Sequence, residues 1–144
     1  MTIQEFKVRA GYVKQLAAVG AKIINGCREF IIENIAEELM LEDETSPYQL
    51  RASFYGLNLL FRAELQLQEH GADGVIAAYR FSYESKPVEI PLNIRYEFDR
   101  QGNVIKAGAE PRMAHPYDEC PRRLLQDVFS ELANNNITIH PFRK

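Results

Sequence analysis

The sequence has few cysteines and no long hydrophobic run, and these two absences narrow the class of protein. Its 144 residues include only Cys27 and Cys120, which lie far apart and in no metal-binding or redox spacing. Small secreted domains usually carry several disulfides, so we expect two reduced thiols in a cytoplasmic protein. No stretch approaches the roughly 18 apolar residues that a membrane-spanning helix needs. We also expect no signal peptide, because the N-terminal segment has an acid at Glu5 and no continuous apolar core.

The sequence also lacks a strong charge excess and the common catalytic motifs. The formal net charge is −3 and the pI about 5.7, which gives no general attraction to nucleic acid or to an anionic membrane. Phosphate-binding glycine loops, the HExxH zinc motif, the GxSxG nucleophile elbow and the EF-hand loop are absent. We therefore expect no metal, no cofactor, no nucleic-acid partner and no membrane partner. The same absences favour a non-catalytic role, while leaving the question of an enzyme open.

What is present suits one soluble domain over residues 1–144. Hydrophobic residues make up 46% and charged residues 26%, enough for a core and a hydrated surface. The first forty residues carry an apolar residue every three or four positions, which predicts helix. One helix over 2–41 would be about 60 Å long, so it must either break or project and pack on a partner. We favour two helices, over 2–18 and 21–41, separated near Gly20 and Asn25-Gly26.

Capping signals mark the ends of the predicted helical regions. Thr2 with Glu5 fits a capping box at the N-terminus. Near the other end of the chain, Pro121 suits the first turn of a helix, and an apolar stripe at helical spacing follows over 124–132. The segment 137–139 has the composition of a short last strand.

Between the helical regions the hydrophobic period changes from 3.6 to 2, which predicts strands. Four segments alternate in this way, over about 52–68, 75–84, 90–98 and 104–107. Turn residues separate them, including an Asp99–Asn103 hairpin loop closed by a glycine. We therefore predict an α+β fold in which N-terminal helices and a C-terminal helix pack on one face of an antiparallel meander of about four strands.

The pairing register can be predicted from the first turn. If this turn centres on Ala72, Leu65 lies opposite Tyr79 and Glu64 lies opposite Arg80, which joins apolar with apolar and acid with base. Tyr79 then shares the apolar face with Tyr96. The other, polar face carries Arg62, Glu64, Arg80, Arg95 and Glu97. The sequence does not show whether this polar face is covered or exposed to solvent.

Four residues are candidates for a ligand pocket between the sheet and the helices: Tyr79, Arg95, Tyr96 and His115. Buried tyrosine hydroxyls need hydrogen-bond partners, and arginine side chains match carboxylate and phosphate groups. The alternative is that the tyrosines pack in the core and the arginines lie on an ordinary charged surface. The segment from His115 to Cys120 is the densest cluster of reactive side chains, but it has no metal-ligand spacing.

The charge along the first helical region is uneven. Residues 1–24 carry four basic side chains and one acidic one, whereas residues 28–45 carry seven acidic side chains and one basic one. The plain interpretation is a hydrated helix face running into an acidic loop. The more specific interpretation is a docking surface for a basic partner, or antiparallel pairing of two copies of the chain. The predicted partner or dimer interface comprises Ile24, Ile31, Glu33, Glu37 and Glu38.

Two hypotheses about function follow. The first is a non-catalytic cytoplasmic protein-binding module, of a chaperone, adaptor or immunity type, which forms a homodimer or binds another protein. The second is a small-molecule-binding protein or enzyme with its pocket between the sheet and the helices. The absence of catalytic motifs favours the first.

Overall fold

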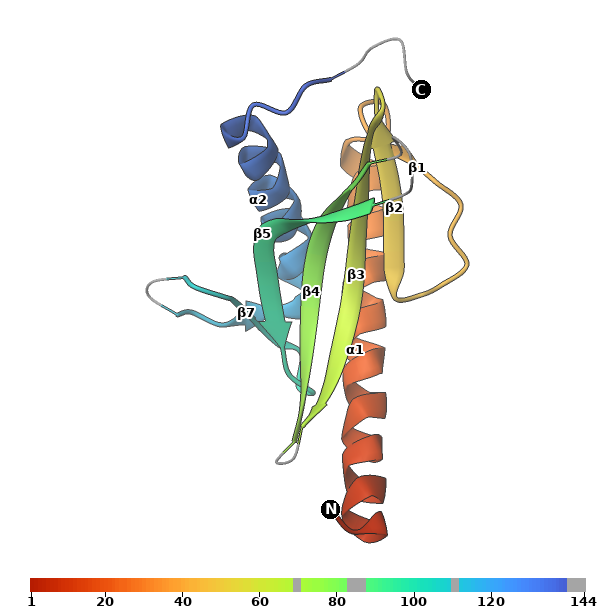
Figure 1. Cartoon of the computed structure of the whole chain (residues 1–144), viewed down its shortest axis with the longest axis vertical. Helices are drawn as coiled ribbons and strands as arrows, with labels where there is room; N and C mark the ends of the chain where they lie inside the picture. Colours follow the sequence, from red (N-terminus) through yellow and green to blue (C-terminus); the bar gives the residue numbers. More distant parts are fainter. Residues whose placement is uncertain (69–70, 83–87, 110–111, 140–144) are drawn as a thin grey trace.

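The computed structural model of the chain describes residues 1–68, 71–82, 88–109 and 112–139. It has the predicted α+β architecture: a long helix, an antiparallel sheet and a C-terminal helix follow one another along the chain. Both helices lie behind the sheet, α1 (Ile3–Asn34) along β3 and β4, and α2 (Cys120–Asn134) along β5 (Figure 1). The main core lies between these two layers.

The N-terminal region is one unbroken helix of 32 residues, not the two helices expected from the sequence. Neither Gly20 nor Gly26 breaks α1. Each glycine instead allows another part of the chain to pack closely against the helix. A Cβ on Gly20 would lie 3.0 Å from Ala63 Cβ, and one on Gly26 would lie 2.9 Å from Pro121 Cγ. The helix is about 48 Å long, and its first turns extend beyond the end of the β3–β4 hairpin (Figure 1).

Both ends of α1 have simple local causes. The predicted capping box is confirmed: the Thr2 hydroxyl accepts from the Glu5 amide, and the Glu5 carboxylate accepts from the Thr2 amide. The helix ends at Asn34 rather than near residue 41. The chain beyond it instead supplies a short edge strand, β1 (Met40–Leu41), which pairs with the next strand.

The sheet has seven strands among the described residues, more than the four expected, and each pairs antiparallel with its neighbours along the chain. The segment predicted as one long strand is a hairpin of β2 (Gln49–Phe54) and β3 (Leu57–Gln68). Tyr55 and Gly56 form its two-residue turn with positive φ angles of 42° and 81°. Positive φ at both central positions is the geometry of a type I′ turn. The remaining strands are β4 (Gly71–Ser82), β5 (Val88–Phe98), β6 (Asn103–Lys106) and β7 (His115–Pro116).

The predicted β3–β4 register is wrong, and the error turns β4 over. Tyr79 pairs with Leu60 and Arg80 with Leu59, not with Leu65 and Glu64. The observed pairing differs from the predicted pairing by an odd number of residues. Every side chain of β4 therefore lies on the face opposite to the predicted one. The alternation of apolar residues in β4 does not identify its buried face, because the four consecutive residues 75–78 are all buried. Arg80 therefore lies on the face toward the helices, whereas Tyr79 lies on the outer face.

Of the other local predictions, the Asp99–Asn103 turn and the start of the C-terminal helix agree with the structure, and the short last strand does not. The Asp99 carboxylate accepts from the backbone amides of Gln101 and Asn103 in the β5–β6 turn, and Gly102 adopts φ 85°. Pro91, which lacks an amide hydrogen, adjoins an irregularity in the β4–β5 pairing. Pro121 occupies the first turn of α2. Residues 137–139 do not form the short last strand.

Candidate functional site

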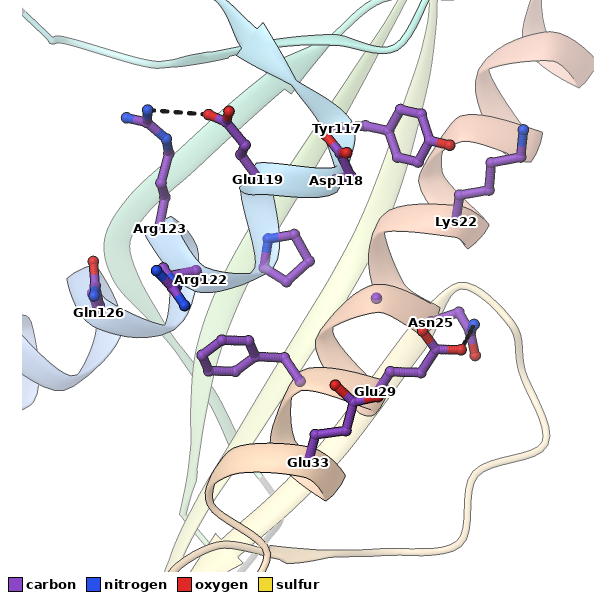
Figure 2. A pocket seen from close by; sticks show the side chains of 13 residues that line it. Lys22, Asn25, Glu29, Glu33, Tyr117, Asp118, Glu119, Arg122, Arg123 and Gln126 are labelled. Carbon is purple, nitrogen blue, oxygen red and sulfur yellow. Dashed lines mark hydrogen bonds and ion pairs between the residues drawn. The ribbon is translucent and has the colours of Figure 1, made fainter.

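The first turns of α2 lie between two cavities. The larger one, about 1040 Å³, opens between α1, the 3-10 turn η1 (Tyr117–Glu119) and α2 (Figure 2). The smaller one, about 330 Å³, lies between α2 and the sheet edge formed by β5, β6 and β7. Arg123 and Gln126 line both cavities. These two side chains therefore form a common wall.

The larger cavity is lined by charged side chains that face water. Glu29 and Glu33 come from α1, whereas Arg122 and Arg123 come from α2 (Figure 2). Arg123 forms an ion pair with Glu119 one turn away at 3.3 Å, and both side chains are more than half exposed. Exposed pairs of this kind contribute little to stability. We interpret this cavity as a hydrated groove between two helices.

The smaller cavity is lined by a connected group of polar side chains. Its lining residues are Tyr96, Lys106, Ala109, Met113, His115, Arg123, Gln126 and Asp127. The Tyr96 hydroxyl donates a hydrogen bond to Asp127 Oδ2, and Lys106 Nζ lies 3.0 Å from the same oxygen. Burial, reinforced by Asp127, raises the pKa of Tyr96 far above its usual value. Tyr96 is therefore a protonated donor at neutral pH.

His115 is the unusual member of this group. The residue is 6% exposed, and its Nε2 atom is buried without a hydrogen-bond partner among the described residues. Its ring stands edge-on to Tyr96, with 5.8 Å between the ring centroids. Burial lowers the pKa of His115, and Arg123 lowers it further, against a weaker opposing effect of Glu119. The imidazole is therefore neutral at pH 7, with one nitrogen left to bond to something else.

The structure brings together two of the four predicted ligand residues. Tyr96 and His115 line the same cavity. Tyr79 and Arg95 lie on the outer face of the sheet, because Tyr79 pairs with Leu60 in the shifted register and Arg95 adjoins Tyr96 in one strand. Neither lines the cavity.

Both helices lie on the other face of the sheet, yet Leu60 and Ala77 on the outer face are buried. Several charged side chains of this face pair with one another. Arg62 donates two hydrogen bonds to Glu89, at 2.7 and 3.0 Å, and lies over the Tyr79 ring. The Tyr79 hydroxyl donates to Glu64. Glu89 holds the pKa of Arg62 above its usual value, and Arg62 holds the pKa of Glu89 below its own. Arg51 Nε, also on this face, is buried without a hydrogen-bond partner but lies 3.4 Å from Glu44 Oε2. We interpret this face as a surface on which most charged groups lie beside an opposite charge.

The predicted interface residues separate by burial. Ile24 and Ile31 are 0% exposed and belong to the core between α1 and the sheet. They are therefore not available to a second copy of the folded chain. Glu33, Glu37 and Glu38 are exposed, and they stay predicted interface residues. Glu33 also lines the larger cavity.

Sequence reasoning missed Lys106, Arg123 and Asp127. A signal for Lys106 was present, because the Asp99–Asn103 turn sets the β5–β6 register that places Lys106 opposite Tyr96. No comparable signal pointed to Asp127, since its contact with Tyr96 depends on how α2 packs against β5.

Comparison with known proteins identifies no relative of this chain. It matches no protein-family model, no curated protein and no solved structure. Among the described residues, no group of three or more His, Cys, Asp or Glu side chains is placed to hold a metal ion. In the same part of the chain, neither α1 nor α2 combines the length and apolar character needed to cross a membrane.

Proposed function

We propose that this protein binds a small polar molecule in the cavity lined by Tyr96, Lys106, His115 and Asp127. The observation that carries the proposal is the buried Nε2 atom of His115, which has no partner among the described residues. Buried polar groups in folded proteins nearly always have a hydrogen-bond partner. A bound molecule that hydrogen-bonds to this nitrogen would supply it.

The charges of the lining residues favour an anionic ligand. Lys106 and Arg123 are cationic, whereas Asp127 is the only acid among the described lining residues. Arg123 also forms an ion pair with Glu119. Asp127 is already engaged by Tyr96 and Lys106. We therefore propose a small carboxylate that carries a second polar group, with the carboxylate near the cations and the polar group at His115.

The cavity has the physical features of a binding site. Its volume of about 330 Å³ is at the lower end of the range for small-molecule pockets. Three separate strands and a helix supply six of the eight described lining residues, and the connection between β6 and β7 supplies Ala109 and Met113. The polar side chains are therefore held by the sheet and the core. Hydrogen bonding and an ion pair connect Tyr96, Asp127 and Lys106 to one another, and positioning of this kind would lower the entropic cost of binding.

Thermal unfolding in the presence of a panel of small carboxylates tests this proposal. A ligand at 100 times its dissociation constant should stabilise the wild type by about 2.7 kcal/mol. His115→Phe, which keeps the ring but removes both nitrogens, should abolish the stabilisation. Arg95→Gln, on the outer face, is the matched control and should retain it. Equal stabilisation of wild type and His115→Phe would contradict the proposal.

A second candidate function is protein binding by the projecting part of α1, with a second copy of the chain as partner. Ile3, Phe6 and Val8 are 79%, 51% and 47% exposed, and such apolar groups often mark interaction sites. Antiparallel pairing of two α1 helices would bring the basic segment 1–24 of one copy toward the acidic segment 28–45 of the other.

Sedimentation equilibrium tests this second function. The wild type should sediment as a dimer, and Phe6→Asp should sediment as a monomer with an unchanged circular-dichroism spectrum. Val88→Asp provides a control, because Val88 is also about half exposed but lies on β5. A wild type that stays monomeric at high concentration rules out the homodimer.

A further inference from the structure

An apolar groove lies where α1 and α2 both end, beside the β2–β3 hairpin (Figure 1). Its volume is about 330 Å³. Phe129 of α2 and Phe54 of β2 line it and are 39% and 37% exposed, so both rings are partly in contact with water. A partner that covered these rings would remove apolar surface from water, which is favourable. The described lining residues are Ile35, Glu38, Leu39, Phe54, Leu57, Leu59, Phe129, Leu132, Ala133, Ile137 and Ile139.

Acidic side chains accompany this groove. Glu38 is the only charged residue in its described lining. Glu37 precedes Glu38 in the chain, and Glu33 lies in the last turn of α1; all three side chains are exposed. Among the described residues, none of the three forms an ion pair. The groove therefore favours a partner that carries a basic group next to apolar ones.

The projecting end of α1 has this complementary character. Ile3 and Phe6 are 79% and 51% exposed. They share one face of the helix with Ala10, because residues three and seven positions apart lie close to the same line along a helix. Lys7 adjoins this face, four residues after Ile3. Apolar residues at positions i, i+3 and i+7 are the usual anchors of a helix that binds in an apolar groove.

The helix α1 connects the projecting end to the groove. The groove begins at Ile35, the residue directly after α1, whereas Ile3 and Phe6 lie at the opposite end of the same helix. The helix is about 48 Å long, so the chain cannot place this end in its own groove. Two copies with antiparallel α1 helices would instead place each projecting end at the groove of the other copy. A reciprocal interface of this kind closes with twofold symmetry.

We infer that the apolar groove binds the projecting end of α1 from a second copy of the chain, with Ile3 and Phe6 against Phe54 and Phe129 and with Lys7 near Glu38. The inference rests on the second candidate function and adds to it the surface that binds the projecting end. Only the anchor side chains need to enter a groove of this volume. Contacts along the rest of the two helices, where segments 1–24 and 28–45 oppose each other, add the area that a stable dimer needs.

Sedimentation equilibrium of groove variants tests the inference on the full chain. Phe129→Asp places a charge in the groove and should raise the dissociation constant of the dimer at least about tenfold, as expected for loss of a central apolar contact. Ser130→Asp is the matched control, because Ser130 is exposed on α2 but is outside the described groove lining. It should dimerise like wild type. Phe54→Asp provides a second groove variant if the circular-dichroism spectrum shows that Phe129→Asp does not fold.

These measurements separate the inference from the second candidate function. A wild type that stays monomeric contradicts both and leaves the groove to a different occupant. A dimeric wild type that Phe6→Asp dissociates, with Phe129→Asp and Phe54→Asp both dimeric, supports the second candidate function and overturns the inference.

Thiol cross-linking identifies the contact directly. An equimolar mixture of Phe6→Cys and Phe129→Cys, treated with a short bismaleimide, should give a covalent dimer. Phe6→Cys alone should give none, because the two projecting ends lie at opposite ends of an antiparallel pair. The native Cys27 and Cys120 are buried and should not react in the folded protein. A mixture of Phe6→Cys and Val88→Cys is the control. Cross-linking of Phe6→Cys to itself, or equal yields in the two mixtures, would contradict the inferred arrangement.

Discussion

The two faces of the sheet carry similar residue types but treat them differently. On the outer face, Arg62 pairs with Glu89 and Tyr79 with Glu64. On the face toward the helices, His115 Nε2 is buried without a hydrogen-bond partner among the described residues, whereas the buried Arg51 Nε on the outer face at least lies 3.4 Å from a Glu44 carboxylate oxygen. Charged groups that lie beside an opposite charge of the same chain need no ligand, whereas a buried nitrogen without any such partner needs a hydrogen bond from elsewhere. The pairing of the polar groups therefore decides where a ligand is expected.

The buried and exposed sides of α1 should also contribute differently to the free energy of unfolding. Truncation of a core side chain should change this free energy the most. Ile24 and Ile32 lie on the same helix, but Ile24 is fully buried against the sheet and Ile32 is 56% exposed. Ile24→Ala should lower the free energy of unfolding by about 2–5 kcal/mol because it leaves a cavity. Ile32→Ala should change it by about 0.5 kcal/mol or less. Urea unfolding of the two variants measures the difference, and similar losses would show that the buried face of α1 is misplaced.

Removal of polar groups around the candidate site should give the next largest effects, in opposite directions. Tyr96→Phe removes the donor to Asp127 and should lower the free energy of unfolding by about 1–2 kcal/mol. His115→Phe removes an unpaired buried nitrogen and should leave stability unchanged or raise it by about 1 kcal/mol. Chemical denaturation without added ligand compares them. A large loss of stability in His115→Phe would show that the imidazole makes a structural interaction, and would remove the main support for a ligand there.

The lowered pKa of His115 predicts a pH effect of intermediate size. Below its usual pKa of 6.5 the unfolded chain binds a proton that the folded chain excludes. Stability should therefore fall as pH decreases from about 7 through 6.5 toward the lower pKa of the folded state. Urea unfolding between pH 5 and 7.5 measures this slope, which should be smaller in His115→Phe. Parallel slopes in wild type and variant would contradict a neutral, buried His115.

The outer face should give the smallest effect. Arg62→Met removes the bidentate pair with Glu89, whose two side chains are each about one-third exposed. We expect a loss of about 0.5–1 kcal/mol in low salt and less at 1 M salt, because exposed ion pairs are screened. Urea unfolding at both salt concentrations measures it. A salt-independent loss of several kcal/mol would indicate that this face is covered rather than hydrated.

The elements predicted well are those that depend on neighbours in sequence. The Thr2 cap, the Asp99–Asn103 turn and the start of α2 at Pro121 depend on contacts within a few residues. The α+β class followed from the change in hydrophobic period. Gly20 and Gly26 misled because a glycine that breaks a helix and one that admits a close neighbour look alike in sequence.

Half of the candidate site could be predicted, and the β4 register explains part of the other half. Tyr96 and His115 were predicted ligand residues and both line the cavity, whereas Tyr79 lies on the outer face because the register of β4 differs from the predicted one. Arg95 could have been excluded from the sequence alone, because adjacent residues of a strand point to opposite faces. Asp127 depends on packing between elements distant in sequence, which periodicity does not report.

Native mass spectrometry of the purified protein, with wild type, His115→Phe and Arg95→Gln compared, tests the central claim most directly. We predict that wild type and Arg95→Gln each retain a small molecule that His115→Phe lacks. If wild type shows only the mass of the bare polypeptide, or if His115→Phe retains the same molecule, His115 is not the centre of a ligand site and the proposed function is contradicted.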